Sequence, residues 1–106
     1  VLTILLHNAV SYTPENGKIT VFLSYRKTAH RHFLLAVSDT GVGIDDDEKQ
    51  HIFERFYRSE KARSDKNHFG LGLSIAYEII AAHGGTIAVA DNPNAERGTT
   101  FTVRLP

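Results

Sequence analysis

The feature that most constrains the fold is an apolar run that ends in an acidic turn with two glycines. The run covers residues 33–38, and the turn that follows it is Asp39-Thr40-Gly41-Val42-Gly43. Short apolar runs between turn residues are typical of strands. Glycine accepts main-chain angles that other residues avoid, and it carries no side chain. We therefore expect a strand end at which the main chain approaches a flat ligand and a carboxylate points at it.

The alternation of side chains along the predicted strand decides where Asp39 points. Asp39 has the same parity as Phe33, Leu35 and Val37, so it faces the core if they do. A buried carboxylate is costly unless it is hydrogen-bonded, and an adenine amino group is a fitting donor. An aspartate that bonds the main chain of its own turn explains the same pattern. The residues alone leave both interpretations open.

Composition bounds the class of protein. The chain has 106 residues, enough for one domain, and its formal net charge is zero. Without a basic excess we expect no nucleic-acid partner, and without cysteine there is no disulfide or thiolate metal site. No apolar run reaches the roughly 20 residues of a membrane helix, so we expect no direct membrane contact. The chain opens inside an apolar helical pattern without methionine, and we expect a piece of a longer protein.

Hydrophobic periodicity predicts one helix, two strands, two helices and two strands. Because strands and helices come in blocks, the order favours an α+β two-layer sandwich. The predicted elements are a helix through Leu2, Leu5, Leu6 and Ala9 ending near Tyr12, strands 18–25 and 32–38 joined by polar residues 26–31, a helix capped by Asp45-x-x-Glu48 and carrying Ile52, Phe53 and Phe56, a long loop 57–69, a helix through Leu73, Ala76, Tyr77 and Ile80 ended by Gly84-Gly85, and strands 86–90 and 99–105.

Three further groups of residues fit a phosphate-bearing ligand, and each has a plain alternative. Gly70-Leu71-Gly72-Leu73 opens a helix, whose free N–H groups attract phosphate, although helix packing explains the glycines equally well. Asn8 shares a helix face with Tyr12, and its amide oxygen suits magnesium, but a surface asparagine is the simpler interpretation. Between Arg55 and Lys66 basic residues outnumber acidic ones, as in a phosphate-binding lid or in a solvated loop.

The order of these motifs resembles that of bacterial sensor histidine kinases. The resemblance covers nearly the whole chain, which looks like the catalytic and ATP-binding domain of a two-component kinase. The matching segments are Leu5-Leu6-His7-Asn8-Ala9-Val10-Ser11-Tyr12-Thr13-Pro14 (N box), Asp39-Thr40-Gly41-Val42-Gly43-Ile44 (G1 box), Ile52-Phe53-Glu54-Arg55-Phe56-Tyr57-Arg58 (F box), Gly70-Leu71-Gly72-Leu73-Ser74-Ile75 (G2 box), and the closing patterns His83-Gly84-Gly85-Thr86 and Gly98-Thr99-Thr100-Phe101.

The resemblance implies a Bergerat-type ATP-binding fold, an α+β sandwich with a mixed sheet packed against three helices. It assigns Asn8 to magnesium, Asp39 to the adenine amino group and Arg58 to the terminal phosphate, with Asn8 and Arg58 as catalytic residues. Phe53 and Phe56 would anchor the lid. The full set implied to contact nucleotide is Asn8, Tyr12, Asp39, Gly41, Gly43, Ile44, Phe53, Arg58, Gly70, Leu71, Gly72, Thr99 and Thr100.

The same resemblance implies the reaction and the partners. A domain of this kind binds ATP with magnesium and donates the terminal phosphoryl group to a histidine in an upstream dimerisation domain, which makes the full-length protein a homodimer. A response regulator receiver domain is the next partner. Residues 1–106 would then be the catalytic domain without its first strand and without the phosphoacceptor helices, and would not transfer phosphate alone. The expected location is the cytoplasmic side of a membrane-anchored sensor kinase.

Three residues depart from the family pattern. Ile4 replaces a common asparagine, Ser11 a common lysine, and His68 the usual first glycine of the G2 box. Gyrase-like and chaperone ATPases carry a glutamate at the position of Ile4 as general base, and isoleucine cannot take a proton, so hydrolysis by that route is not expected. One alternative is an ATP-binding module that transfers nothing, which these departures favour. The other alternative is an anti-sigma-type serine kinase, but the F box favours the histidine-kinase branch instead.

Overall fold

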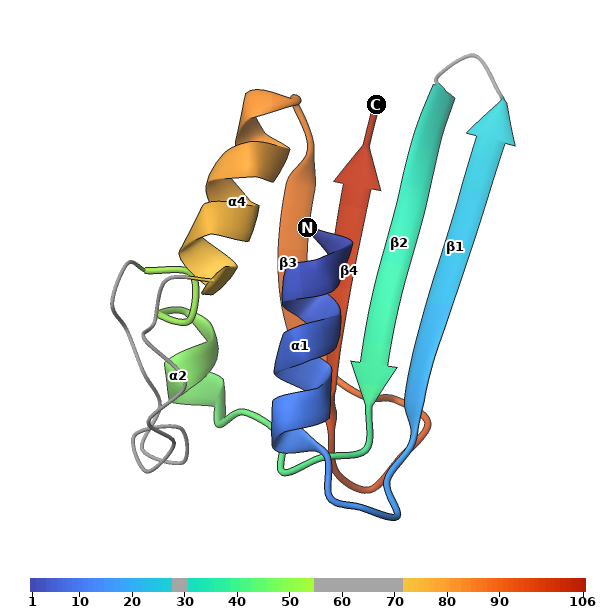
Figure 1. Cartoon of the computed structure of the whole chain (residues 1–106). Helices are drawn as coiled ribbons and strands as arrows, with labels where there is room; N and C mark the ends of the chain where they lie inside the picture. Colours follow the sequence, from blue (N-terminus) through green and yellow to red (C-terminus); the bar gives the residue numbers. More distant parts are fainter. Residues whose placement is uncertain (28–30, 55–71) are drawn as a thin grey trace.

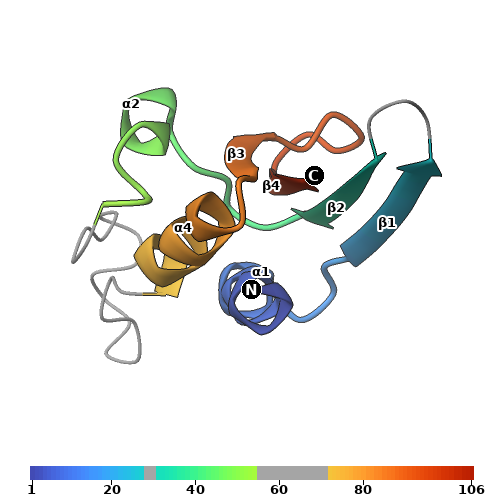
Figure 2. The same cartoon turned by 90° about the horizontal axis from the view of Figure 1, so that it is seen from above.

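The chain folds into two layers, with helices on one face of a sheet. The structure is a computed structural model, and it describes residues 1–27, 31–54 and 72–106. These residues form a four-stranded sheet in the order β1-β2-β4-β3, and helices α1 and α4 lie side by side on one of its faces (Figures 1 and 2). The expected α+β two-layer sandwich is confirmed. The elements are α1 Leu2–Tyr12, β1 Ile19–Lys27, β2 Arg31–Asp39, α2 Asp46–Lys49, α4 Gly72–Ala82, β3 Thr86–Asp91 and β4 Thr99–Leu105.

The sheet differs from the expected one in a single respect. Every strand pair among the described residues is antiparallel, so this part of the sheet is not mixed. The reason is connectivity: β1 runs directly into β2 and β3 directly into β4, and β2 and β4 meet in the middle in opposite directions. A parallel pair requires a crossover connection, which neither hairpin provides.

The apolar core lies between the two long helices and strands β2, β4 and β3. None of the fully buried core residues comes from strand β1. On the face of β1 that the register aligns with Val37 and Leu35, Val21 is 47% exposed and Leu23 is 69% exposed. The helices therefore cover three strands and leave the fourth open. The buried core residues are Leu5, Ala9, Val37, Ile52, Ala76, Ile80, Ile87, Phe101 and Val103.

Local sequence explains where the two long helices end. Thr13 after α1 is extended, with φ −102° and ψ 126°, as expected of a residue that precedes a proline. Gly84 after α4 has φ +75°, and the N–H of Gly85 donates to the carbonyl of Ile80 at 2.9 Å. This is the usual way in which glycine ends a helix. Both predicted helix ends are confirmed.

The hairpin between β1 and β2 is longer than its sequence predicts. Lys27 and Arg31 pair across the hairpin, although the polar residues 26–31 were expected to form the connection. Main-chain hydrogen bonds hold a strand whatever the polarity of its side chains, and the Arg26 and Lys27 side chains of the outer strand β1 are exposed, so their place in the strand costs little. Residues 28–30 lie outside the described part of the chain.

The helix predicted to start at Asp45 is a single turn. Helix α2 covers Asp46–Lys49, and its N-cap residue Asp45 makes no side-chain capping hydrogen bond, so the half of the predicted capping box that the Asp45 side chain would supply does not form. Ile52 and Phe53 lie beyond the end of α2. Ile52 is nevertheless buried, which shows that contacts with the core decide the path of this segment. Phe56 and the predicted loop 57–69 lie outside the described residues.

Candidate functional site

Asp39 ends strand β2 with its side chain inside the protein. The residue is 2% exposed. Its Oδ1 accepts hydrogen bonds from the main-chain N–H groups of Gly41 at 2.9 Å and Thr99 at 3.2 Å, while its Oδ2 has no partner among the described residues. The turn bond and a ligand contact are therefore compatible. Oδ1 holds the turn, and Oδ2 remains for a further donor.

Burial also makes this carboxyl group responsive to a donor. Desolvation raises the pKa of Asp39 above its ordinary value of 3.8, and the hydrogen bonds from Gly41 and Thr99 counter only part of that rise. A carboxylate that has lost solvation gains more from one additional N–H donor than an exposed one does. Asp39 is thus suited to accept a hydrogen bond from the amino group of a base.

The turn that follows β2 is held against the end of helix α1. The N–H of Val42 donates to the carbonyl of Tyr12 at 3.3 Å. Thr40 exchanges two hydrogen bonds with Lys18, one from its own N–H to the Lys18 carbonyl at 3.1 Å and one from the Lys18 N–H to its Oγ1 at 2.8 Å. A Cβ on Gly41 would lie 2.8 Å from the carbonyl carbon of Tyr12. Only glycine allows this close approach.

Helix α1 leads from the start of helix α4 to this turn. Ile4 lies beside Gly72, the first residue of α4, because a Cβ on Gly72 would be 3.4 Å from Ile4 Cγ2. One turn further along α1 is Asn8, and one turn beyond it is Tyr12, both half-buried. The side chain of Asn8 has no hydrogen-bond partner among the described residues. The N box therefore joins the two glycine boxes along one helix face.

Phe53 attaches the chain to the core just before residues 55–71. Its ring centroid lies 6.2 Å from that of Phe101 in β4 and 5.6 Å from that of Tyr77 in α4. Lys49 in α2 adds an ion pair of 2.7 Å to Asp91 at the end of β3. Residues 49–53 are thus joined both to the helix layer and to the sheet. That Phe53 anchors a lid stays a prediction, since the lid lies outside the described residues.

Only one of the two threonines predicted near adenine lies beside Asp39. Thr99 is 4% exposed and donates to Asp39 through its N–H. The hydroxyl of Thr100 instead lies 2.8 Å from that of Ser38, with which Thr100 is paired across β2 and β4. Neighbouring residues of a strand point to opposite faces. The structure therefore does not bring the Thr100 side chain to the site.

One residue that contacts Asp39 was not identified from the sequence. Asn92 is 8% exposed, and its Nδ2 donates to the main-chain carbonyl of Asp39 at 2.8 Å across 53 residues of chain. Its sole signal is the pattern Asp91-Asn92-Pro93-Asn94, which predicts a turn. Nothing in that pattern indicates which distant carbonyl the amide contacts.

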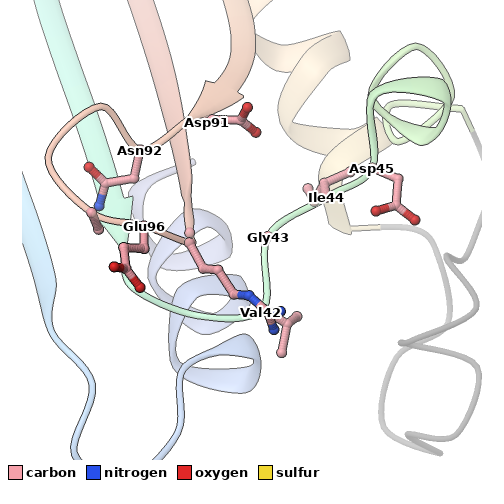
Figure 3. Close-up of a pocket in the computed structure, with 10 residues that line it drawn as sticks. Val42, Gly43, Ile44, Asp45, Asp91, Asn92 and Glu96 are labelled. Carbon is pink, nitrogen blue, oxygen red and sulfur yellow. The ribbon is translucent and has the colours of Figure 1, made fainter.

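A small hollow lies beside the G1 turn. It has a volume of about 190 Å³ and is lined by residues of segments 42–45 and 91–98, among them Gly43 and Ile44 (Figure 3). Gly43 has φ +77° there, and Ile44 packs against the core. Asn8, Tyr12 and Asp39 do not line this hollow, and pockets for drug-sized ligands measure roughly 300–1,000 Å³. Of the described residues predicted to contact nucleotide, this hollow includes Gly43 and Ile44.

The remaining predicted contacts fall in the segment that is not described. Arg58, Gly70 and Leu71 lie outside the described residues, while Gly72 begins α4. Within residues 1–27, 31–54 and 72–106, no group of three or more His, Cys, Asp or Glu side chains could hold a metal ion. In the same ranges, no helix is both long and apolar enough to cross a bilayer.

The fold defines the class, an α+β two-layer domain with two helices on one face of a sheet that is antiparallel among the described residues. The family model described as histidine kinase-, DNA gyrase B- and HSP90-like ATPase matches residues 1–106. The chain belongs to this family. Sensor histidine kinases are among its relatives, and the chain superposes on the catalytic domain of the histidine kinase ThkA with a TM-score of 0.81 at 30% identity.

Two relatives show how far the likeness extends. The sensor protein CiaH of Streptococcus pneumoniae is 47% identical over 105 residues, which cover 98% of this chain and 22% of CiaH. The adaptive-response sensory kinase SasA of a Nostoc species is 42% identical over 106 residues, which cover 100% of this chain and 25% of SasA. The chain thus spans a quarter or less of the length of these curated relatives.

Solved structures agree with the relatives. The mycobacterial sensor histidine kinase MprB superposes with a TM-score of 0.85 at 35% identity, covering 97% of this chain and 67% of that one. Full-length ShkA in complex with AMPPNP has a TM-score of 0.74 at 30% identity, covering 99% and 20%. Histidine kinase ThkA in complex with the response regulator TrrA has a TM-score of 0.74 at 31% identity, covering 99% and 27%.

Proposed function

We propose that this domain binds ATP with magnesium and donates the terminal phosphoryl group to a histidine in a dimerisation domain of the full-length protein. That protein would be a homodimer that passes the phosphoryl group to a response regulator receiver domain. The proposal also places the domain on the cytoplasmic side of a membrane-anchored sensor. The observation that carries the proposal is Asp39, a buried carboxylate with one oxygen fixed by main-chain N–H groups and the other without a described partner.

The layout of helix α1 gives the proposed nucleotide a direction. Tyr12 and Asp39 lie at the end of α1 and would contact the adenine ring, with Gly41 and Gly43 leaving room for it. The start of α4 lies at the other end of the same helix face, beside Ile4. Free N–H groups at a helix start attract phosphate. Adenine at one end and phosphates at the other fit this geometry.

Asn8 lies between these ends and fits magnesium. Its half-buried amide is without a described partner, and magnesium is usually held by one or two protein oxygens together with substrate phosphates and water. A site without an acidic cluster is therefore compatible with this ion. When bound, magnesium would neutralise charge on the phosphates. Arg58, Gly70 and Leu71 are proposed to contact phosphate on the family resemblance alone.

Transfer rather than hydrolysis is the proposed reaction. The phosphorus–oxygen bond to the bridging oxygen of ATP breaks, a bond to a ring nitrogen of the acceptor histidine forms, and ADP leaves. Positioning and charge neutralisation supply most of such catalysis. Ile4 stands where related ATPases carry a general base, and its aliphatic side chain packs near Gly72. A side chain without a basic atom cannot activate water there.

Calorimetry tests the binding part of the proposal. The chain is titrated with ADP and AMPPNP in magnesium, together with Asp39→Asn and the control Asp46→Asn, whose side chain is 93% exposed in α2. A hydrogen bond to a charged group contributes about 1.5–3 kcal/mol, so Asp39→Asn should weaken adenine nucleotides roughly 10- to 100-fold. Asp46→Asn should bind like the unchanged chain. No binding of the unchanged chain into the millimolar range would refute the proposal.

A second candidate function is an ATP-binding module that transfers nothing. Ser11 favours it, because its hydroxyl donates to the His7 carbonyl at 2.9 Å within α1, where the family often has a cationic lysine. The full-length protein, incubated with ATP labelled on its terminal phosphate, separates the two functions. Acid-labile phosphohistidine that is lost in Asn8→Ala supports the kinase. Nucleotide binding without any phosphohistidine supports the module.

We further propose that a strand from outside residues 1–106 pairs with β1. Strand β1 is at the edge of the described sheet, and Val21, Leu23 and Tyr25 on one face and Phe22 on the other are 47, 69, 48 and 54% exposed. Long apolar edge strands are normally covered. In the full-length protein, amide hydrogen exchange of β1 should be much slower than in residues 1–106 alone. Equal exchange in both would contradict the added strand.

A further inference from the structure

The segment that connects β3 to β4 holds Asp39 from two sides. The N–H of Thr99 donates to the Asp39 carboxylate at 3.2 Å, and the side-chain amide of Asn92 donates to the Asp39 main-chain carbonyl at 2.8 Å. A Cβ on Gly98 would lie 2.9 Å from the carbonyl carbon of Asp39, and closer still to its oxygen. The two strand ends are therefore packed main chain against main chain at this point.

Asn92 is the side chain that fixes this contact. It is 8% exposed, and both ends of its amide are used: Nδ2 donates to Asp39, and Oδ1 accepts from the N–H of Asn94 at 3.0 Å. Its own N–H donates to the Gly98 carbonyl at 3.1 Å. Figure 3 shows Asn92 on the segment opposite Gly43 and Ile44. Asn92 thus joins its own turn to the end of β2.

The Asp39 carbonyl needs this partner because it is buried at the end of the strand pairing. The register of β2 with β4 runs from Phe33 to Ser38 and stops one residue before Asp39. A buried carbonyl without a donor is costly, and the main chain would move to find one. Because Oδ2 lies only three bonds from the Asp39 Cα, a shift of this main chain moves the oxygen that the proposed function assigns to adenine.

We propose that Asn92 is a positioning residue for adenine recognition, acting through the main chain of Asp39. The proposal rests on the proposed nucleotide site and adds a residue to it that does not touch the nucleotide. An asparagine suits the position because one amide supplies the donor for Asp39 and the acceptor for Asn94. An alanine supplies neither, and an ionised aspartate lacks the donor that the Asp39 main-chain carbonyl requires.

The test compares ATP with inosine triphosphate, which carries an oxygen in place of the adenine amino group. The dissociation constant of inosine triphosphate divided by that of ATP measures, in the unchanged chain, how strongly Asp39 favours the amino group. Asp39→Asn gives the same ratio when this preference is lost. Asn92→Ala should reduce the ratio about tenfold toward that limit. A residue with only a structural role would weaken both nucleotides equally and leave the ratio unchanged.

The matched control is Asn94→Ala. Asn94 is exposed and contributes only its main-chain N–H to the Asn92 amide, so its replacement should leave the ratio and the stability unchanged. If Asn92→Ala does not fold, as judged by circular dichroism, Asn92→Ser replaces it, because a hydroxyl retains one donor. That variant should reduce the ratio about threefold.

The outcomes separate this inference from the proposed function. Failure of the unchanged chain to bind ATP, or to prefer it over inosine triphosphate, refutes the adenine site itself. A normal preference in the unchanged chain that persists in Asn92→Ala, or in Asn92→Ser where alanine does not fold, overturns the role of Asn92 alone. A reduced preference in these variants with a normal one in Asn94→Ala supports it.

Discussion

Replacing Gly98 by alanine should damage the protein far more than replacing Gly84, although both glycines have positive φ. Gly98 has φ +129° and Gly84 φ +75°. A Cβ on Gly84 meets its nearest atom, Cγ of Pro106, at 3.8 Å, which is ordinary contact. A Cβ on Gly98 lies 2.9 Å from the Asp39 carbonyl carbon and 3.0 Å from Thr40 Cα, and all of these are main-chain atoms that cannot turn aside.

The magnitudes follow from these two environments. A non-glycine residue in the left-handed region costs about 1–2 kcal/mol, which is the whole expected cost of Gly84→Ala. In Gly98→Ala, main-chain strain costs about 1–3 kcal/mol, and forcing a carbon into a packed site adds about 1–3 kcal/mol. The expected loss is roughly 2–6 kcal/mol, a large part of the ~5–15 kcal/mol that stabilises a typical domain.

Urea unfolding followed by circular dichroism measures both free energies, and calorimetry with ADP measures the site. At the middle of the two ranges, Gly98→Ala should lose about 2.5 kcal/mol more stability than Gly84→Ala. It should also bind ADP more weakly, because the collision displaces Asp39. Gly84→Ala should bind ADP like the unchanged chain. Equal losses of stability in the two variants would refute the argument that contact with Asp39, rather than positive φ, makes Gly98 necessary.

Two further predictions concern the core and the charge of Asp39. Leu5→Ala should lower the free energy of unfolding by about 2–5 kcal/mol because Leu5 is 0% exposed, and Leu2→Ala, at 41% exposed, should lower it much less; similar urea midpoints for the two would contradict this. Burial raises the pKa of Asp39 above 3.8, so acidification through that raised pKa should neutralise the carboxylate and weaken ADP binding. Over the same range the free energy of unfolding should gain a contribution from Asp39, because the folded state binds the proton more tightly than the unfolded state does. That gain should stop growing once the pH falls to the pKa of Asp39 in the unfolded chain. ADP titrations across pH should show this step in the unchanged chain, and its persistence in Asp39→Asn would rule out Asp39 as its origin.

The sequence predicted the elements whose signals are local. The spacing of Leu5 and Ala9 gave helix α1, and Pro14 and Gly84 gave the helix ends. Alternation along residues 33–38 correctly placed Asp39 on the core face, since strand geometry forces that result once the face is known. Predictions were wrong where distant contacts outweigh local preference. Ile52 lies beyond α2 rather than in it, because its side chain is buried in the core without the helix extending to this residue.

The candidate site divides in the same way. The N box and the two glycine boxes are recognisable from residue order, but their proximity is not, because Ile4 reaches Gly72 only through the packing of α1 against α4. Thr99 and Thr100 are equivalent in the sequence. The register of β4 separates them, placing the Thr99 N–H on Asp39 and the Thr100 hydroxyl on Ser38.

By itself, the sequence predicted an α+β fold from the order of its elements and, through the resemblance of its ordered motifs to a known family, an ATP-binding domain. The role of Asp39 in adenine recognition stays a prediction, whereas residue type and short-range spacing fix the strand face on which Asp39 lies and the chemistry of its carboxylate. Only the tertiary structure decided which atoms hold Asp39. Its carbonyl accepts a hydrogen bond from an amide 53 residues away. A contact between two strand ends depends on how distant strands pair in the sheet, which no local pattern encodes.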